Sequence, residues 1–100
     1  MGTQLSTANE ELCAKLHDCV KWITTHLGHW QDRHAGASAD FYNIPGGTLW
    51  YFDDTRWTQI VLNHQIVFEA DPEGRASTFI EGPWIADVLA LAKPMWEGAA

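Results

Sequence analysis

Basic residues are scarce in this chain, and their scarcity argues against one class of function. The 100 residues include six Lys and Arg against 13 Asp and Glu, so the formal net charge is −7. Proteins that follow a nucleic-acid phosphate backbone carry clustered Lys and Arg. The basic residues here are scattered, as Lys15, Lys21, Arg33, Arg56, Arg75 and Lys93. We therefore expect no direct binding of nucleic acid.

The excess of acidic residues has two interpretations. Ordinary solubility explains a net charge of this size in a small protein. An acidic chain can also occupy the basic groove of another protein, and its charge then speeds the encounter. The charge alone favours solubility, and it leaves the second interpretation open.

Cysteine is also scarce, and no hydrophobic run is long. Cys13 and Cys19 lie about 240° apart around the axis of a predicted helix, so they cannot pair with each other. Residues 84–92 form the longest apolar stretch and include Asp87, far short of the ~20 residues that span a bilayer. We expect a cytoplasmic, soluble protein with no disulfide framework, signal peptide or membrane association.

The first residues fit one targeting pattern weakly. Met1, Gly2 and Ser6 match the M-G-x-x-x-[ST] form of N-myristoylation. Stable anchoring needs a second signal, and no basic cluster follows to supply it. We therefore expect no acyl anchor.

Motifs for nucleophilic catalysis are missing. The chain has no glycine-rich phosphate loop and no serine elbow. Cys13 and His17 stand four residues apart on the predicted helix, but a nucleophilic cysteine needs an accessible sulfur with a lowered pKa. Both cysteines flank or join an apolar stripe. We interpret them as buried, unreactive thiols.

Paired carboxylates and paired histidines offer weaker chemical hypotheses. Asp53 with Asp54, or Glu69 with Glu81, could act as acid and base, although neighbouring acids in a turn are usually structural. His26 and His29 would share a helix face if the first helix continued through Gly28. A zinc site needs at least three protein ligands, and the pattern supplies two. We expect no metal and no cofactor.

The first helix is well specified. Thr7 and Glu10 have the form of a capping box. Apolar residues then recur at steps of three and four, as Leu12, Leu16, Cys19, Val20, Ile23, Leu27 and Trp30. We expect the helix to end between Gly28 and His34, with Leu16, Ile23 and Leu27 buried against a sheet.

Short aromatic and β-branched segments, separated by turn signals, predict an antiparallel meander. They cover residues 48–53, 57–62, 65–70 and 75–81, and residues 35–47 are expected to form an ordered loop. Asn63-His64 is a hairpin candidate, and the residues from Asp71 to Gly74 form a stronger turn. Pro83 suits the first turn of a second helix that ends at Lys93-Pro94.

The predicted fold is a two-layer α+β domain of order α-β-β-β-β-α. A four-stranded antiparallel meander has an N-terminal and a C-terminal helix on one face. Residues 1–100 are expected to form a single globular domain, with residues 1–5 and 97–100 frayed.

Tryptophan is abundant, with six in 100 residues. Strand alternation makes both faces of the meander apolar, and its outer face would carry Trp50, Phe52, Trp57 and Gln59. Either this face binds a partner or a second copy of the chain, or the loop at 35–47 and the tail around Trp96 cover it.

The leading hypothesis is a small acidic, non-enzymatic protein-binding module. Its class would be that of inhibitors, immunity proteins and phage- or plasmid-encoded anti-defence proteins, which act by occluding a partner surface. The partner would be a protein with a basic surface, and a homodimer is a further candidate. The expected partner-binding residues are an aromatic anchor with acidic turn residues around it: Trp50, Phe52, Asp53, Asp54, Trp57, Asp71 and Glu73.

A small enzyme or ligand-binding domain is the alternative hypothesis. Its pocket would lie between the sheet and the loop at 35–47, with Asp40, Tyr42 and His64 as polar groups. A metal site at His26 and His29 ranks third.

Overall fold

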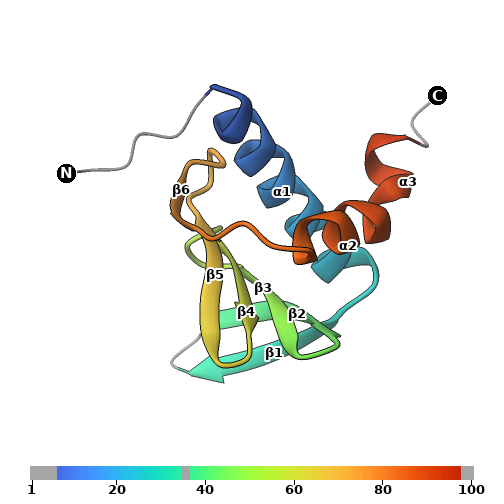
Figure 1. The fold of residues 1–100 in the computed structure, drawn as a ribbon. Helices are drawn as coiled ribbons and strands as arrows, with labels where there is room; N and C mark the ends of the chain where they lie inside the picture. The colour runs from blue at the N-terminus through green and yellow to red at the C-terminus, as the bar shows by residue number, and fades with distance from the viewer. Residues whose placement is uncertain (1–6, 35–36, 98–100) are drawn as a thin grey trace.

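The N-terminal helix and the meander that follows it dominate the computed structural model, which describes residues 7–34 and 37–97. Within these residues, the helices and strands are α1 (Thr7–His26), β1 (His29–His34), β2 (Ala37–Ile44), β3 (Gly47–Phe52), β4 (Thr58–Leu62), β5 (Gln65–Ala70), β6 (Ala76–Phe79), α2 (Trp84–Leu91) and α3 (Lys93–Trp96). Each strand pairs antiparallel with the next, in the order β1-β2-β3-β4-β5-β6. The class is therefore α+β, with one antiparallel sheet and helices at both ends (Figure 1).

The predicted number of strands was wrong. The described residues form a six-stranded sheet, not a four-stranded one, because β1 and β2 precede the predicted strands. Residues 29–34 were expected to fall at the end of the first helix, and residues 37–44 in a loop. Both segments instead pair as strands, with Trp30 opposite Asp40 and Tyr42 opposite Leu49. Such pairing is non-local, so local sequence signals report it poorly.

The apolar stripe of α1 packs on the sheet as predicted, except at its end. Leu16 and Ile23 are fully buried, whereas Leu27 is 44% exposed. Leu27 lies beyond the last helical residue, His26, although its N–H still donates to the Ile23 carbonyl (2.8 Å). At Gly28 the chain passes so close to the Phe41 carbonyl oxygen that a Cβ would collide with it. The helix therefore ends before the predicted range, and the chain turns into β1.

The turns of the meander have the predicted positions. Asn63 and His64 both adopt positive φ, 50° and 65°, which is the geometry of a two-residue hairpin loop. Gly74 has a φ of 83°, and its N–H donates to the Asp71 carbonyl (2.8 Å). Residues that tolerate these angles stand where the strands reverse, so the register of β4, β5 and β6 follows from local chemistry.

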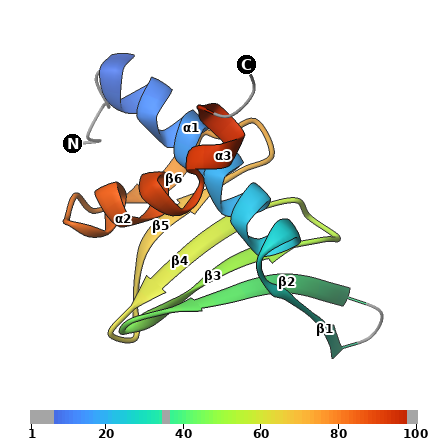
Figure 2. The ribbon, with the colours of Figure 1, turned by 90° about the vertical axis from the view of Figure 1, so that its right-hand side faces the viewer.

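The helices lie together on one side of the sheet (Figures 1 and 2). Leu49, Ile60 and Phe68 from the strands form the core with the stripe of α1 and with Val88 of α2. The indole of Trp84 also belongs to this core, and its Nε1 donates to the Ile80 carbonyl (2.9 Å). We call the opposite side of the sheet the outer face. Among the described elements, no helix covers it.

The remaining expectations about the ends of the chain fall largely outside the described residues. Residues 1–5, the myristoylation pattern and residues 98–100 lie there. Glu97 is described, and it is the C-cap residue of α3, with its N–H donating to the Lys93 carbonyl (2.8 Å). Within residues 7–34 and 37–97, no helix has the length and apolar character needed to cross a membrane.

Candidate binding surface on the outer face of the sheet

A row of side chains crosses the outer face from one edge of the sheet to the other. In the strand register, each of its members lies directly opposite the next: His29, Phe41, Trp50, Gln59, Glu69 and Thr78. Residues that lie opposite each other in antiparallel strands project to the same face and are close enough to interact. We call this set the central row.

The first half of the central row is aromatic. The ring centroids of His29 and Phe41 are 5.7 Å apart, and those of Phe41 and Trp50 are 5.4 Å apart. Phe52, two residues after Trp50, places its ring nearly parallel to the indole (6.0 Å, 5°). Phe41, Trp50 and Phe52 are only partly buried. The rings of Phe41, Trp50 and Phe52 therefore form a continuous aromatic surface on the outer face.

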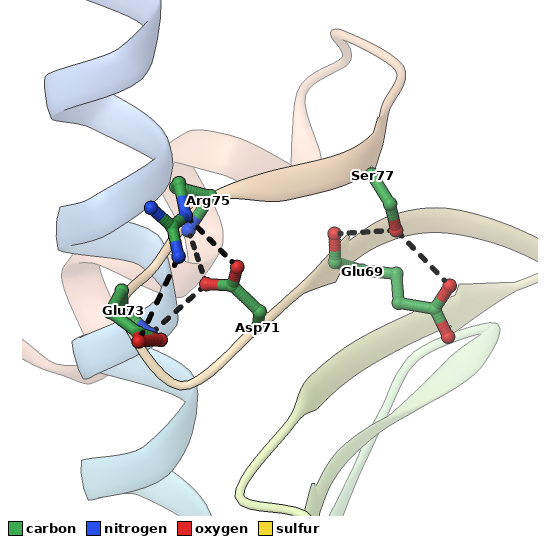
Figure 3. A network of polar contacts seen from close by, with 5 residues as sticks. All are labelled: Glu69, Asp71, Glu73, Arg75 and Ser77. Carbon is green, nitrogen blue, oxygen red and sulfur yellow. Dashed lines mark hydrogen bonds and ion pairs between the residues drawn. The ribbon is translucent and has the colours of Figure 1, made fainter.

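The second half of the central row is polar. Gln59 Nε2 donates to Glu69 Oε2 (2.9 Å). Ser77 Oγ donates to Glu69 Oε1 (3.3 Å), as Figure 3 shows, and Ser77 also contacts the Glu69 carbonyl oxygen (3.4 Å). The carboxylate of Glu69 is thus held from both sides on the uncovered face.

Hollows lie beside the aromatic surface at both ends of the strands. One, of about 450 Å³, is lined by Trp50 and Val61 together with the turn residues Asn63 and His64. The other, of about 470 Å³, is lined by Phe52, Asp54, Gln59 and Glu69 among others. We call the second one the Glu69 hollow.

The structure divides the predicted partner-binding residues between two regions. Trp50 and Phe52 lie on the outer face, Asp54 is exposed and lines the Glu69 hollow, and Trp57 is half-buried just before β4. Asp53 lies where β3 ends, and its Oδ2 accepts a hydrogen bond from Ser38 Oγ (2.6 Å).

The remaining two predicted residues, Asp71 and Glu73, lie in the β5–β6 turn. Arg75 forms ion pairs there with Asp71 (3.1 Å) and with Glu73 (3.7 Å), as Figure 3 shows. Partial burial acts to raise the pKa of Asp71, but hydrogen bonds from Arg75 and from the Glu73 backbone lower it overall. Gly74 of the same turn packs against Ala14 of α1. These two acids therefore belong to a turn on the helical side of the sheet.

Sequence reasoning missed three contributors to the outer face. His29 and Phe41 stand on strands that were not predicted, and Glu69 was considered only as one of a pair with Glu81. The aromatic and β-branched residues Phe41, Tyr42 and Ile44 were the available signal for β2, since such residues are enriched in strands.

A pair of carboxyl groups that the sequence did not indicate joins Asp40 of β2 to Asp53, just after β3. Burial raises the pKa of Asp40, and both the charge of Asp53 and a hydrogen bond between the two carboxyl groups raise it further. Asp40 lies opposite Tyr51, two residues before Asp53. Sequence reasoning considered Asp53 only beside Asp54 and interpreted that pair as structural; only the β2–β3 register places Asp40 beside Asp53.

The two thiols of α1 and the imidazole of His17 are buried. Cys13 and Cys19 are inaccessible, and burial raises the pKa of both, that of Cys19 to about 11. His17 Nδ1 lies 2.8 Å from Thr58 Oγ1 of β4, and burial lowers the pKa of this imidazole. A high thiol pKa and a sulfur without access to solvent disfavour nucleophilic attack.

His26 and His29 do not share a helix face. His26 ends α1, where its ring stacks on Trp22 (4.8 Å, 17°), and His29 begins β1. Within the described parts of the chain, no three His, Cys, Asp or Glu residues are grouped as a metal would require.

The pocket that the alternative hypothesis placed between the sheet and a loop at 35–47 is not formed in that way by the described residues. Residues 37–44 are a strand within the sheet, so they cannot form a loop over it. Asp40 and Tyr42 lie opposite Tyr51 and Leu49, on the face that the helices cover. His64 lines the hollow beside Trp50 on the outer face. The three polar groups are therefore not brought together.

The candidate site is thus a broad, partly aromatic and partly acidic surface with shallow hollows. Searches of protein-family models, curated proteins and solved structures gave no match to this chain.

Proposed function

We propose that this protein is a small acidic, non-enzymatic binding module that docks a basic partner protein on the outer face of its sheet. The observation that carries the proposal is the aromatic surface formed by Phe41, Trp50 and Phe52 on a face without a helical cover. Aromatic side chains supply much of the free energy at protein interfaces, because they remove a large area from water with few rotatable bonds.

The distribution of charge supports a basic partner. The chain has a net charge of −7, and both Asp54 and Glu69 line a hollow on this face. Charges of one sign around an apolar centre steer an oppositely charged partner and raise the association rate. The module would act by covering the partner's surface, as inhibitors, immunity proteins and anti-defence proteins do; this class comparison is an analogy from size and charge.

The chemistry of the described residues favours binding over catalysis. The thiols are buried with raised pKa values, and the imidazole of His17 is engaged with Thr58 in the core. A nucleophile and its base must both reach a substrate, which these groups do not. Free, buried cysteines also suit the reducing cytoplasm, where we place the protein.

The test begins with affinity capture from the source cell and identification of the retained protein. The purified partner is then titrated calorimetrically against the wild-type chain and against Trp50→Ala. We expect Trp50→Ala to weaken binding roughly 30-fold, the effect of a hot-spot residue worth about 2 kcal/mol.

The matched control is Trp96→Ala. Trp96 is also exposed (41%), but it belongs to α3 on the helical side and donates to the Leu89 carbonyl (2.9 Å). Its substitution should leave the affinity within about twofold, since surface changes away from an interface have small effects. If both substitutions weakened binding equally, or if neither weakened it, docking on the outer face would be contradicted.

Self-association is the competing use of the same face. Sedimentation equilibrium at several concentrations distinguishes it, because a homodimer on this face would dissociate in the Trp50→Ala variant. We expect a monomer, since two copies with seven net negative charges each repel one another.

A further inference from the structure

The Glu69 hollow combines an aromatic ring, carboxylates and an amide on the uncovered face. Its lining includes Phe52, Asp54, Gln59 and Glu69, and its volume is about 470 Å³. A side chain of the size of arginine or lysine fits within such a volume. The hollow adjoins the aromatic surface, because the Phe52 ring belongs to both.

Glu69 is held in place and keeps unused acceptor capacity. Its Oε2 accepts from Gln59 and its Oε1 accepts from Ser77 (Figure 3). An ionised carboxylate offers about four acceptor sites, so each oxygen can accept another hydrogen bond. The group is therefore preorganised toward a donor without being saturated.

Among the side chains that the structure describes, no ion pair joins a cation to this carboxylate. The ion pairs between these side chains join Arg75 to Asp71 and Glu73, and Lys93 to Glu97. Figure 3 shows the Arg75 guanidinium directed at the turn acids and not at Glu69. Lys15 and Lys21 lie over the rings of Trp96 and Tyr51. The exposed Asp54 likewise has no ion-pair partner among these residues.

We propose that the Glu69 hollow receives an arginine side chain of the partner protein. This inference rests on the proposed function and names the residue type that the outer face recognises. Glu69 and Asp54 supply the charge complementarity. Gln59 donates its amide N–H to Glu69, which leaves its carbonyl oxygen as a further acceptor.

The chemistry of the lining favours guanidinium over ammonium. A guanidinium carries five N–H donors in a planar fork, which matches several acceptors spread around one hollow. A guanidinium also packs favourably against aromatic side chains, and Phe52 is among the lining residues. A lysine ammonium is a compact, strongly hydrated charge that uses the ring and the amide less well.

The direct test is a ¹⁵N NMR titration with N-acetyl-arginine amide. We expect saturable shift changes confined to the backbone amides of the hollow, such as those of Phe52, Gln59 and Glu69. The neutral isostere N-acetyl-citrulline amide should cause none at the same concentration. N-acetyl-lysine amide should bind at least about threefold more weakly. Equal responses to arginine and citrulline, or tighter binding of lysine, would overturn the proposal.

Glu69→Gln is the variant that tests the role of the carboxylate. It should weaken binding of the arginine amide about tenfold, the effect of losing a charged hydrogen bond. The amide spectrum of the variant should otherwise match that of the wild type, which shows that the protein is folded. Asp87→Asn, an exposed acid on α2, is the matched control and should bind as the wild type does. Unchanged affinity of Glu69→Gln would refute the inference.

A further comparison separates this inference from the proposed function. One outcome is that the partner protein loses affinity for Trp50→Ala but binds Glu69→Gln as tightly as it binds the wild type. In that case the proposal of an arginine in the Glu69 hollow is wrong, and the proposal of docking on the outer face stands. If neither substitution affects the partner, both proposals fail. If both weaken binding, and an arginine-to-lysine change in the partner does so too, the inference is supported.

Discussion

At the scale of single residues, His17 joins the first helix to the sheet. Its imidazole is buried in the α1–β4 contact and lies 2.8 Å from the Thr58 hydroxyl. Burial lowers the pKa of His17; the nearby charges of Asp18 and Asp71 and a hydrogen bond to the Pro72 backbone raise it, while Lys21 lowers it. The neutral imidazole is therefore the form that the core accepts.

This lowered pKa predicts a loss of stability in mild acid. The unfolded chain takes up the His17 proton below about pH 6.5, whereas the folded chain resists it, so protonation favours unfolding. The contribution is complete above that pH and is lost as the pH falls toward the folded pKa. We expect the urea midpoint to drop between about pH 7.5 and 5.5.

The control for this prediction uses a second histidine. His17→Gln should reduce the drop, and His26→Gln, at the exposed end of α1, should retain it. A pH profile that is the same in the wild type and in His17→Gln would contradict the assignment.

Asp40 predicts the opposite pH dependence. Its pKa is raised by burial and by Asp53, so the unfolded chain loses this proton first as the pH rises above about 4. Ionisation of Asp40 therefore favours unfolding. We expect Asp40→Asn to increase the free energy of unfolding at pH 7 and to have no such effect at pH 3, measured by urea denaturation. Asp54→Asn, at an exposed acid, should change stability little at either pH.

At the scale of elements, the stripe of α1 predicts contrasting effects of two leucines. Leu16 is fully buried, so Leu16→Ala should lower the free energy of unfolding by about 2 to 5 kcal/mol. Leu27 is 44% exposed beyond the end of the helix, and Leu27→Ala should cost less than about 0.5 kcal/mol. Chemical denaturation of both variants checks the pair. Similar losses would mean that the helix extends further than His26.

At the scale of the whole molecule, the net charge predicts the kinetics of association. Asp54→Lys should mainly slow association with the basic partner, because it reverses a charge beside the outer face. Asp87→Lys makes the same change in net charge on α2 and should slow it less. Stopped-flow measurements between about 50 and 300 mM salt should show slower association as screening increases. A rate independent of salt, or an effect of Cys13→Ala, would argue against the binding module.

The parts of the fold that the sequence predicted are those that local chemistry determines. The stripe from Leu16 to Ile23 has a helical period, and Asn63, His64 and Gly74 mark the reversals of the chain. Their conformations depend on neighbours a few residues away. α1, α2, four of the strands and the aromatic character of the outer face were accessible for this reason, whereas α3 was not predicted.

The remaining features depend on which strands become neighbours, and only the tertiary structure decides that. β1 and β2 are strands because each pairs with a segment that local signals do not identify, and Leu27 is exposed because the chain leaves the helix to reach that pairing. The same register brings Asp40 beside Asp53 and Gln59 beside Glu69. The sequence by itself determined an acidic, tryptophan-rich chain with an aromatic sheet. The tertiary structure alone decided which aromatics and carboxylates share its uncovered face, because contacts between distant segments form only when the whole sheet does.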